Sequence, residues 1–133
     1  MLIALTQAQR LLSSELANDI KPLGISVDMW ITLNALEETP GLAMTKVADK
    51  LCLYLPTVTK LIDRMVSDNY VYRKPHQTDR RRVLIFPTDR GLTVLHEARA
   101  IAAKFEEKII QHSDLPKETL LTLLSDLKGA VQS

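Results

Sequence analysis

Three consecutive arginines lie in a short polar segment between two strand-like runs. A guanidinium group is a permanent cation with several hydrogen-bond donors, and it suits phosphate and other oxyanions. The flanking runs, Tyr70 to Arg73 and Val83 to Phe86, are rich in β-branched and aromatic residues, which favour strands. We therefore predict a basic β-hairpin whose polar turn, Pro75 to Arg81, approaches an anion. The charged residues of this turn and of the strand start that follows it are Asp79, Arg80, Arg81 and Arg82.

The segment before this hairpin, Thr57 to Asp68, has the pattern of an amphipathic helix. One stripe recurs at helical spacing and is predicted to be buried: Val58, Leu61, Ile62, Met65 and Val66. The opposite side carries Thr57, Lys60 and Arg64, also at helical spacing. A hydroxyl and two cations in line can meet phosphates and guanine edges in a major groove. A helix followed by a basic hairpin is the chain order of a winged helix-turn-helix, so the pattern predicts DNA binding.

Helical periodicity, together with the residues that cap and end helices, predicts the elements that must hold these residues. Leu5, Ala8, Leu12 and Leu16 indicate a first helix that ends near Pro22. Ser26 is predicted to cap a second helix that ends before Thr39-Pro40-Gly41. Thr45 is predicted to cap a short third helix, with a turn at Cys52 to Leu55 before the amphipathic helix.

Two more helices are predicted after the hairpin. Pro87 ends the second strand, and Thr88 is placed to cap a long helix that runs to about Gln111. A last helix follows Pro116 and is leucine-rich along one face. The predicted fold class is mainly α (α+β), a winged helix-turn-helix between long terminal helices.

Composition bounds the class of protein. The 133 residues, 46% hydrophobic and 25% charged, are typical of one globular domain. The net charge is +1, but Met44 to Leu92 holds ten basic and five acidic residues, and the rest holds seven basic and eleven acidic. A basic middle favours a polyanionic partner. The chain lacks an apolar run long enough for a membrane span, and its single cysteine, Cys52, fits a reducing cytoplasm.

These motifs resemble the MarR/SlyA group of bacterial transcriptional regulators. The resemblance rests on Asp79-x-Arg81, on Thr88-x-x-Gly91 and on the upstream run Thr57 to Arg64, at their combined spacing. It implies one domain over residues 1–133 that acts as a homodimer on a pseudo-palindromic operator. Residues 1–22 and 93–133 would be dimerisation helices, and residues 26–92 the DNA-binding lobe. The sequence departs from the family pattern at Tyr54, Asn69 and Pro87. The first departure is expected to change sequence preference.

The resemblance also implies roles for individual residues. Arg81 would enter the minor groove from the wing tip, with Asp79 holding it in place. Thr57, Thr59, Lys60 and Arg64 would lie at the major groove. Residues expected near phosphates are Thr45, Lys46 and Arg73.

A small aromatic or phenolic effector is a further candidate partner, because the family binds such molecules between its dimer helices and its winged lobe. The candidate lining residues are Leu12, Leu16, Met29 and Trp30, for which core packing is the alternative interpretation. The effector would act by shifting the population of lobe spacings.

Other chemistries find no support in the sequence. Cys52 is without a resolving partner and is interpreted as a small half-buried residue. His76, His96 and His112 are too widely spaced for a short metal motif, so neither a metal nor a cofactor is predicted. Motifs for catalysis are missing, and an enzyme is not expected.

The main hypothesis is a ligand-modulated transcriptional repressor or activator. One alternative is a constitutive architectural DNA-binding protein without an effector. Another is a winged helix that docks a protein partner, although Lys60, Arg64 and Arg81 argue against it because such a surface would be neutral or apolar.

Overall fold

The computed structural model describes residues 1–132 as two compact units, Met1–Ile101 and the residues from Ala102 on, with the boundary inside one long helix. The elements of the first unit are α1 Leu2–Ile20, the short 3-10 helix η1 Lys21–Leu23, α2 Val27–Glu38, β1 Leu42–Ala43, α3 Met44–Leu51, α4 Leu55–Ser67, β2 Val71–Pro75, β3 Val83–Pro87 and most of α5 Asp89–His112. The second unit contains the end of α5 and α6 Lys117–Gln132. The predicted class, mainly helical with a winged helix-turn-helix, is confirmed.

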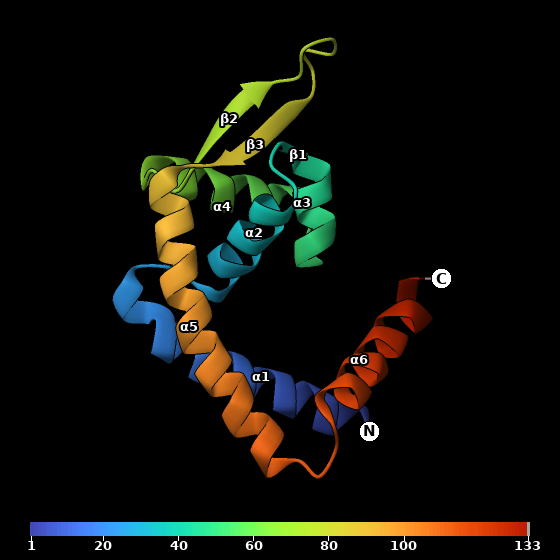
Figure 1. The fold of residues 1–133 in the computed structure, drawn as a ribbon. Helices are drawn as coiled ribbons and strands as arrows, with labels where there is room; N and C mark the ends of the chain where they lie inside the picture. The colour runs from blue at the N-terminus through green and yellow to red at the C-terminus, as the bar shows by residue number, and fades with distance from the viewer. Residues whose placement is uncertain (133) are drawn as a thin grey trace. The chain divides into compact units, whose positions relative to one another are not determined.

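The sheet has three antiparallel strands in the order β1-β3-β2. Strands β2 and β3 form the predicted hairpin, with Tyr72 opposite Phe86, and their rings stack 5.3 Å apart. Figure 1 shows this hairpin extending beyond the helices of the first unit. The strand bounds differ slightly from the prediction, since β2 begins at Val71 and includes Pro75, opposite Val83.

The core of the first unit lies where α2, α3, α4, β3 and α5 converge. The predicted stripe of α4 is confirmed, because Val58, Ile62 and Met65 are fully buried while Leu61 and Val66 are half-buried. Other fully buried side chains include Ile20, Leu33, Leu36, Val47, Ile85 and Leu95. Burial of this stripe fixes which face of α4 is left to solvent.

Two predicted helix caps are confirmed. The Ser26 hydroxyl accepts a hydrogen bond from Met29 N at 3.2 Å at the start of α2. The Thr88 hydroxyl accepts one from Gly91 N at 2.9 Å and donates to Asn69 O at 2.7 Å. Asn69 has φ 62°, a left-handed conformation that asparagine tolerates at the end of a helix. Thr88 therefore caps α5 and ties its start to the residue that follows the C-cap of α4.

Three local predictions are wrong. Thr45 does not cap α3, because the helix begins at Met44 with Ala43 as its N-cap and without a side-chain cap. The turn before α4 ends at Tyr54, so Leu55 is already helical, and Pro56 occupies the first turn. Cys52 is exposed rather than half-buried, and it ends α3 in the left-handed conformation with φ 55°.

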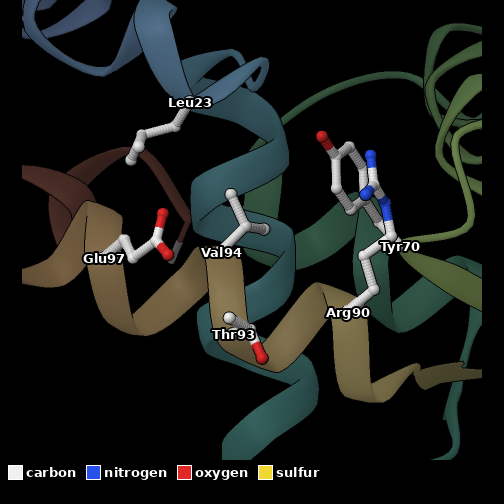
Figure 2. Close-up of a pocket in the computed structure, with 6 residues that line it drawn as sticks. All are labelled: Leu23, Tyr70, Arg90, Thr93, Val94 and Glu97. Atoms are coloured by element: carbon white, nitrogen blue, oxygen red, sulfur yellow. The ribbon is translucent and has the colours of Figure 1, made fainter.

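The start of α5 packs against Tyr70, which is buried just before β2. The guanidinium of Arg90 lies 5.0 Å from the centre of the Tyr70 ring, and its Nε donates to Asp68 O at 3.1 Å. Figure 2 shows this stack at one side of a pocket of about 280 Å³. The residues that line this pocket are Leu23, Tyr70, Arg90, Thr93, Val94 and Glu97.

A polar cluster joins α2 to α5 on the surface. The carboxylate of Glu37 accepts hydrogen bonds from Arg99 Nη2 at 2.6 Å and from His96 Nε2 at 2.7 Å. Arg99 also donates to Asn34 Oδ1 at 3.1 Å. The hydrogen bonds from Arg99 and then His96 lower the pKa of Glu37 below its ordinary value. The sequence patterns did not predict this pairing of two helices.

Candidate nucleic-acid interface

The exposed face of α4 is as the sequence predicted. Thr57, Thr59, Lys60 and Arg64 are all exposed, opposite the buried stripe. The Arg64 side chain is 75% exposed, and its Nε lies 3.8 Å from Asp68 Oδ2 one turn further along. A pair at this distance in water is weak, so the guanidinium remains available to another anion. The Thr59 hydroxyl donates to Leu55 O at 3.0 Å and is used within the helix.

At the wing tip, the structure brings Asp79 and Arg81 together. Asp79 Oδ1 accepts hydrogen bonds from Arg81 N at 3.1 Å and from Arg81 Nε at 3.4 Å. The Arg81 side chain is nevertheless 94% exposed. The carboxylate thus restrains the base of the guanidinium while its outer nitrogens face solvent. Arg80 and Arg82 are exposed beside it and add charge to the same loop.

Arg73 lies on β2 and forms an intramolecular ion pair. Its guanidinium forms an ion pair with the carboxylate of Asp63 on α4. The side chains remain accessible, 35% for Arg73 and 59% for Asp63. The predicted phosphate-contacting residue is therefore also a link between the wing and α4, which sequence reasoning missed.

Thr45 and Lys46 are exposed in the first turn of α3. Helix α3 packs on α2 and α4, and its Val47, Ala48 and Leu51 are buried in the core. Figure 1 shows α3, α4 and the hairpin at one end of the first unit, with α1 at the other. The candidate cations of α3, α4 and the wing are therefore grouped at this end.

The candidate effector residues do not form one site in the isolated chain. Met29 is buried and lines a pocket of about 440 Å³ between α1, α2 and α4. Leu12 is exposed, whereas Leu16 and Trp30 are half-buried and pack on the core. Trp30 Nε1 is buried, and no group among residues 1–132 accepts its hydrogen bond.

Residues 1–132 contain neither a cluster of metal ligands nor a membrane-spanning helix. In the part of the chain that the structure describes, three or more His, Cys, Asp or Glu side chains are nowhere grouped as metal ligands would be. None of the helices within residues 1–132 combines the length and apolarity needed to cross a membrane.

Two helices joined by a tight turn, α3 and α4, followed by a two-stranded wing define a winged helix-turn-helix protein, a class that binds DNA. The sequence model of the MarR family matches residues 25–83, which include α2, α3, α4, β2 and the wing loop as far as the first residue of β3. In these residues the chain is similar to the MarR family.

Known relatives extend the likeness beyond this lobe. The homoprotocatechuate degradative operon repressor of Escherichia coli is 28% identical over 125 residues, which span 87% of this chain and 84% of that protein. The transcriptional repressor CouR, bound to a 23-mer DNA duplex, has a TM-score of 0.82 at 23% identity, over 96% of this chain and 89% of that one. NadR in complex with 4-hydroxyphenylacetate has a TM-score of 0.80 at 25% identity, over 97% of this chain and 89% of that one. The fold is therefore shared over almost the whole chain.

Proposed function

We propose that this protein is a homodimeric, sequence-specific transcriptional repressor that acts in the cytoplasm by binding, without catalysis. Residues 26–92 would read one half of a pseudo-palindromic operator, and residues 1–22 and 93–133 would hold the dimer. A small aromatic effector would release the operator.

The observation that carries this proposal is the restraint of Arg81 by Asp79 at an exposed wing tip. An arginine whose backbone and Nε are held, but whose outer nitrogens are free, suits the negative potential of a narrow minor groove. On α4, Lys60 and Arg64 offer cations to the adjacent major groove. The DNA duplex in the CouR complex supports the same use of this fold.

The dimer is supported by apolar surface that the isolated chain leaves uncovered. Helix α6 has no buried residue, and only Ile20 is buried in α1. The exposed large apolar residues of these two helices are Leu2, Ile3, Leu5, Leu11, Leu12, Leu121, Leu123, Leu124, Leu127 and Val131. A helix of 16 residues gains little stability without burying a face. A second copy of the chain would cover these residues.

Two observations support an aromatic effector. One is a buried hydrogen-bond donor without an acceptor in the described part of the chain, and the other is a similar protein solved with an aromatic ligand. Trp30 Nε1 is buried without an acceptor among the described residues, and it would donate a hydrogen bond to a carboxylate or hydroxyl oxygen of the effector. Leu12, Leu16 and Met29 would contribute apolar surface once a second copy closes the site. NadR has been solved with 4-hydroxyphenylacetate, an aromatic acid of this kind. Titration of that acid against Trp30 fluorescence tests the proposal, since the chain has one tryptophan.

DNA binding is tested by fluorescence anisotropy with a duplex from upstream of the protein's own gene and with a scrambled duplex, at two salt concentrations. We expect tighter, salt-sensitive binding to the native duplex. Equal binding to both duplexes would favour an architectural protein, and no binding would favour a protein-docking module.

Arg81→Ala should weaken binding to the native duplex about 10- to 100-fold while the dimer remains. Arg82→Ala, which removes the same charge from the same loop, is the matched control and should cost much less.

Sedimentation velocity tests the dimer. Leu124→Glu puts a charge on the apolar face of α6 and should produce monomers, because an unpaired charge is costly in an apolar interface. Ser125→Glu puts the same charge on another face and should leave the sedimentation coefficient unchanged. A monomeric wild-type protein would contradict the proposed assembly.

A further inference from the structure

The loop at the wing tip, residues 76–82, is closed by hydrogen bonds that converge on His76. Its imidazole Nδ1 accepts from Thr78 N at 3.2 Å and from Asp79 N at 3.1 Å, and it lies 3.2 Å from the Thr78 hydroxyl. The backbone closes the same loop, since His76 N donates to Arg82 O and Arg82 N donates to Asp79 O, each at 3.0 Å. His76 and Asp79 are half-buried in a loop whose other side chains are exposed.

These contacts specify the chemical form of His76. An imidazole nitrogen accepts a hydrogen bond only when it carries no proton. Two backbone N–H groups point at Nδ1, so this arrangement requires an Nδ1 without a proton, which is the tautomer protonated on Nε2. A nitrogen acceptor at the δ position thereby does what the side chain of Asn or Asp does when it accepts from the backbone two residues ahead.

The same loop connects His76 to Arg81 through one intermediate residue. Asp79 is held at its backbone N by His76, and its Oδ1 holds Arg81 through both N and Nε. We propose that His76 is a positioning residue for DNA binding, which fixes Asp79 in the loop so that Asp79 can direct Arg81. This inference rests on the proposed function, because Arg81 needs a direction only if it enters a groove. His76 itself needs no contact with the duplex.

Substitutions that keep or move the acceptor atom test this assignment. Asn carries an oxygen at the δ position, where His has Nδ1, whereas the oxygen of Gln lies one bond further out, where His has Nε2. We expect His76→Asn to bind the native duplex within about twofold of wild type. His76→Gln should bind about 5- to 20-fold more weakly, which corresponds to one or two lost hydrogen bonds. Gln77→Ala, at an exposed neighbouring position, is the control and should bind like wild type.

A double-mutant cycle with Arg81 separates positioning from a direct contact. If His76 acts through Arg81, His76→Gln should have little further effect in an Arg81→Ala background. Additive losses would instead mean that His76 contacts the duplex or stabilises the lobe independently, and they would overturn the proposal. His76→Gln binding as tightly as wild type would overturn it as well.

Nuclear magnetic resonance tests the loop without DNA. The ¹⁵N shifts of the His76 ring should indicate a proton on Nε2, and the amides of Thr78 and Asp79 should exchange slowly in wild type and in His76→Asn but quickly in His76→Gln. A proton on Nδ1, or unprotected amides in wild type, would overturn the inference. A wild-type protein with this protected loop that binds no duplex would instead show that the proposed function has failed, and so the two failures are distinguishable.

Discussion

The guanidinium of Arg73, on β2, is ion-paired with the carboxylate of Asp63, on α4. The pair connects the base of the wing to the helix that would occupy the major groove. It also pairs a cation that could otherwise bind a phosphate. In addition, the carboxylate of Asp63 repels a polyanion. Asp63 therefore favours a fixed wing at the expense of electrostatic attraction.

We expect Asp63→Asn to raise the affinity for both the native and the scrambled duplex, by about 3- to 10-fold at low salt, because it removes a negative charge and frees Arg73. The ratio of the two affinities should stay unchanged, since the added attraction is independent of sequence. Anisotropy with both duplexes measures this. Asp19→Asn, which removes an exposed carboxylate from α1, controls for net charge. Weaker binding to both duplexes would instead mean that the pair is needed to orient the wing.

Lys60 and Arg64 should differ in what they contact. Lys60 lies nearer the N-terminus of α4 than Arg64 does. The N-terminal residues of a recognition helix are those that contact base edges. Lys60→Ala should therefore change base preference at one operator position, measured with a set of single-substitution duplexes. Arg64 lies near the end of α4, and Arg64→Ala should reduce affinity uniformly and lower the salt slope by about 1. The opposite pattern would reverse the two assignments.

Local periodicity was enough to predict most of this fold. The buried stripe of α4, the caps at Ser26 and Thr88 and the long α5 follow from residue types within one or two turns of the chain. Strand β1 was not predicted, because two residues are too few for a period and it exists only by pairing with β3. That pairing also explains the error at Thr45, since the chain passes directly from β1 into α3 and the helix begins one residue before Thr45.

The candidate interface was predicted as a set of side chains but not as a set of contacts. Spacing placed Lys60 and Arg64 on one exposed face, and the wing motif placed Asp79 beside Arg81. The partners of Arg73 and His76 depend on how the hairpin folds back on α4 and on itself. Single-sequence periodicity describes one element at a time and therefore carries no information on such pairs.

Gly91, in the first turn of α5, should not tolerate a side chain. A Cβ there would lie 2.1 Å from the backbone oxygen of Tyr70 and 3.1 Å from Leu33 Cδ2. Because backbone cannot move away as a flexible side chain can, Gly91→Ala should lower the free energy of unfolding by about 2–4 kcal/mol.

Gly129→Ala is the control, since nothing lies within 4 Å of a Cβ at that helical position. It should be neutral or stabilising by about 1 kcal/mol. Urea unfolding at one protein concentration compares them, and equal stabilities would contradict the close packing at Gly91.

The cluster around Glu37 should make stability depend on pH in a defined direction. Hydrogen bonds from Arg99 and His96 lower the pKa of Glu37 in the folded protein below its ordinary value of 4.5. The native state therefore binds fewer protons than the unfolded state near this pH, so the contribution of Glu37 is fully present above pH 4.5 and is lost as the pH falls below it.

Glu37→Gln should accordingly have a lower Tm than wild type at about pH 7, and the difference should shrink as the pH falls through the folded-state pKa. Glu38→Gln, the exposed neighbour on the same helix, removes the same charge and should change Tm little at either pH. Thermal unfolding followed by circular dichroism over this pH range provides the measurement. A Tm difference for Glu37→Gln that persists undiminished in acid would mean that the side chain stabilises the contact between α2 and α5 by packing, because only an electrostatic contribution disappears when the carboxylate is protonated.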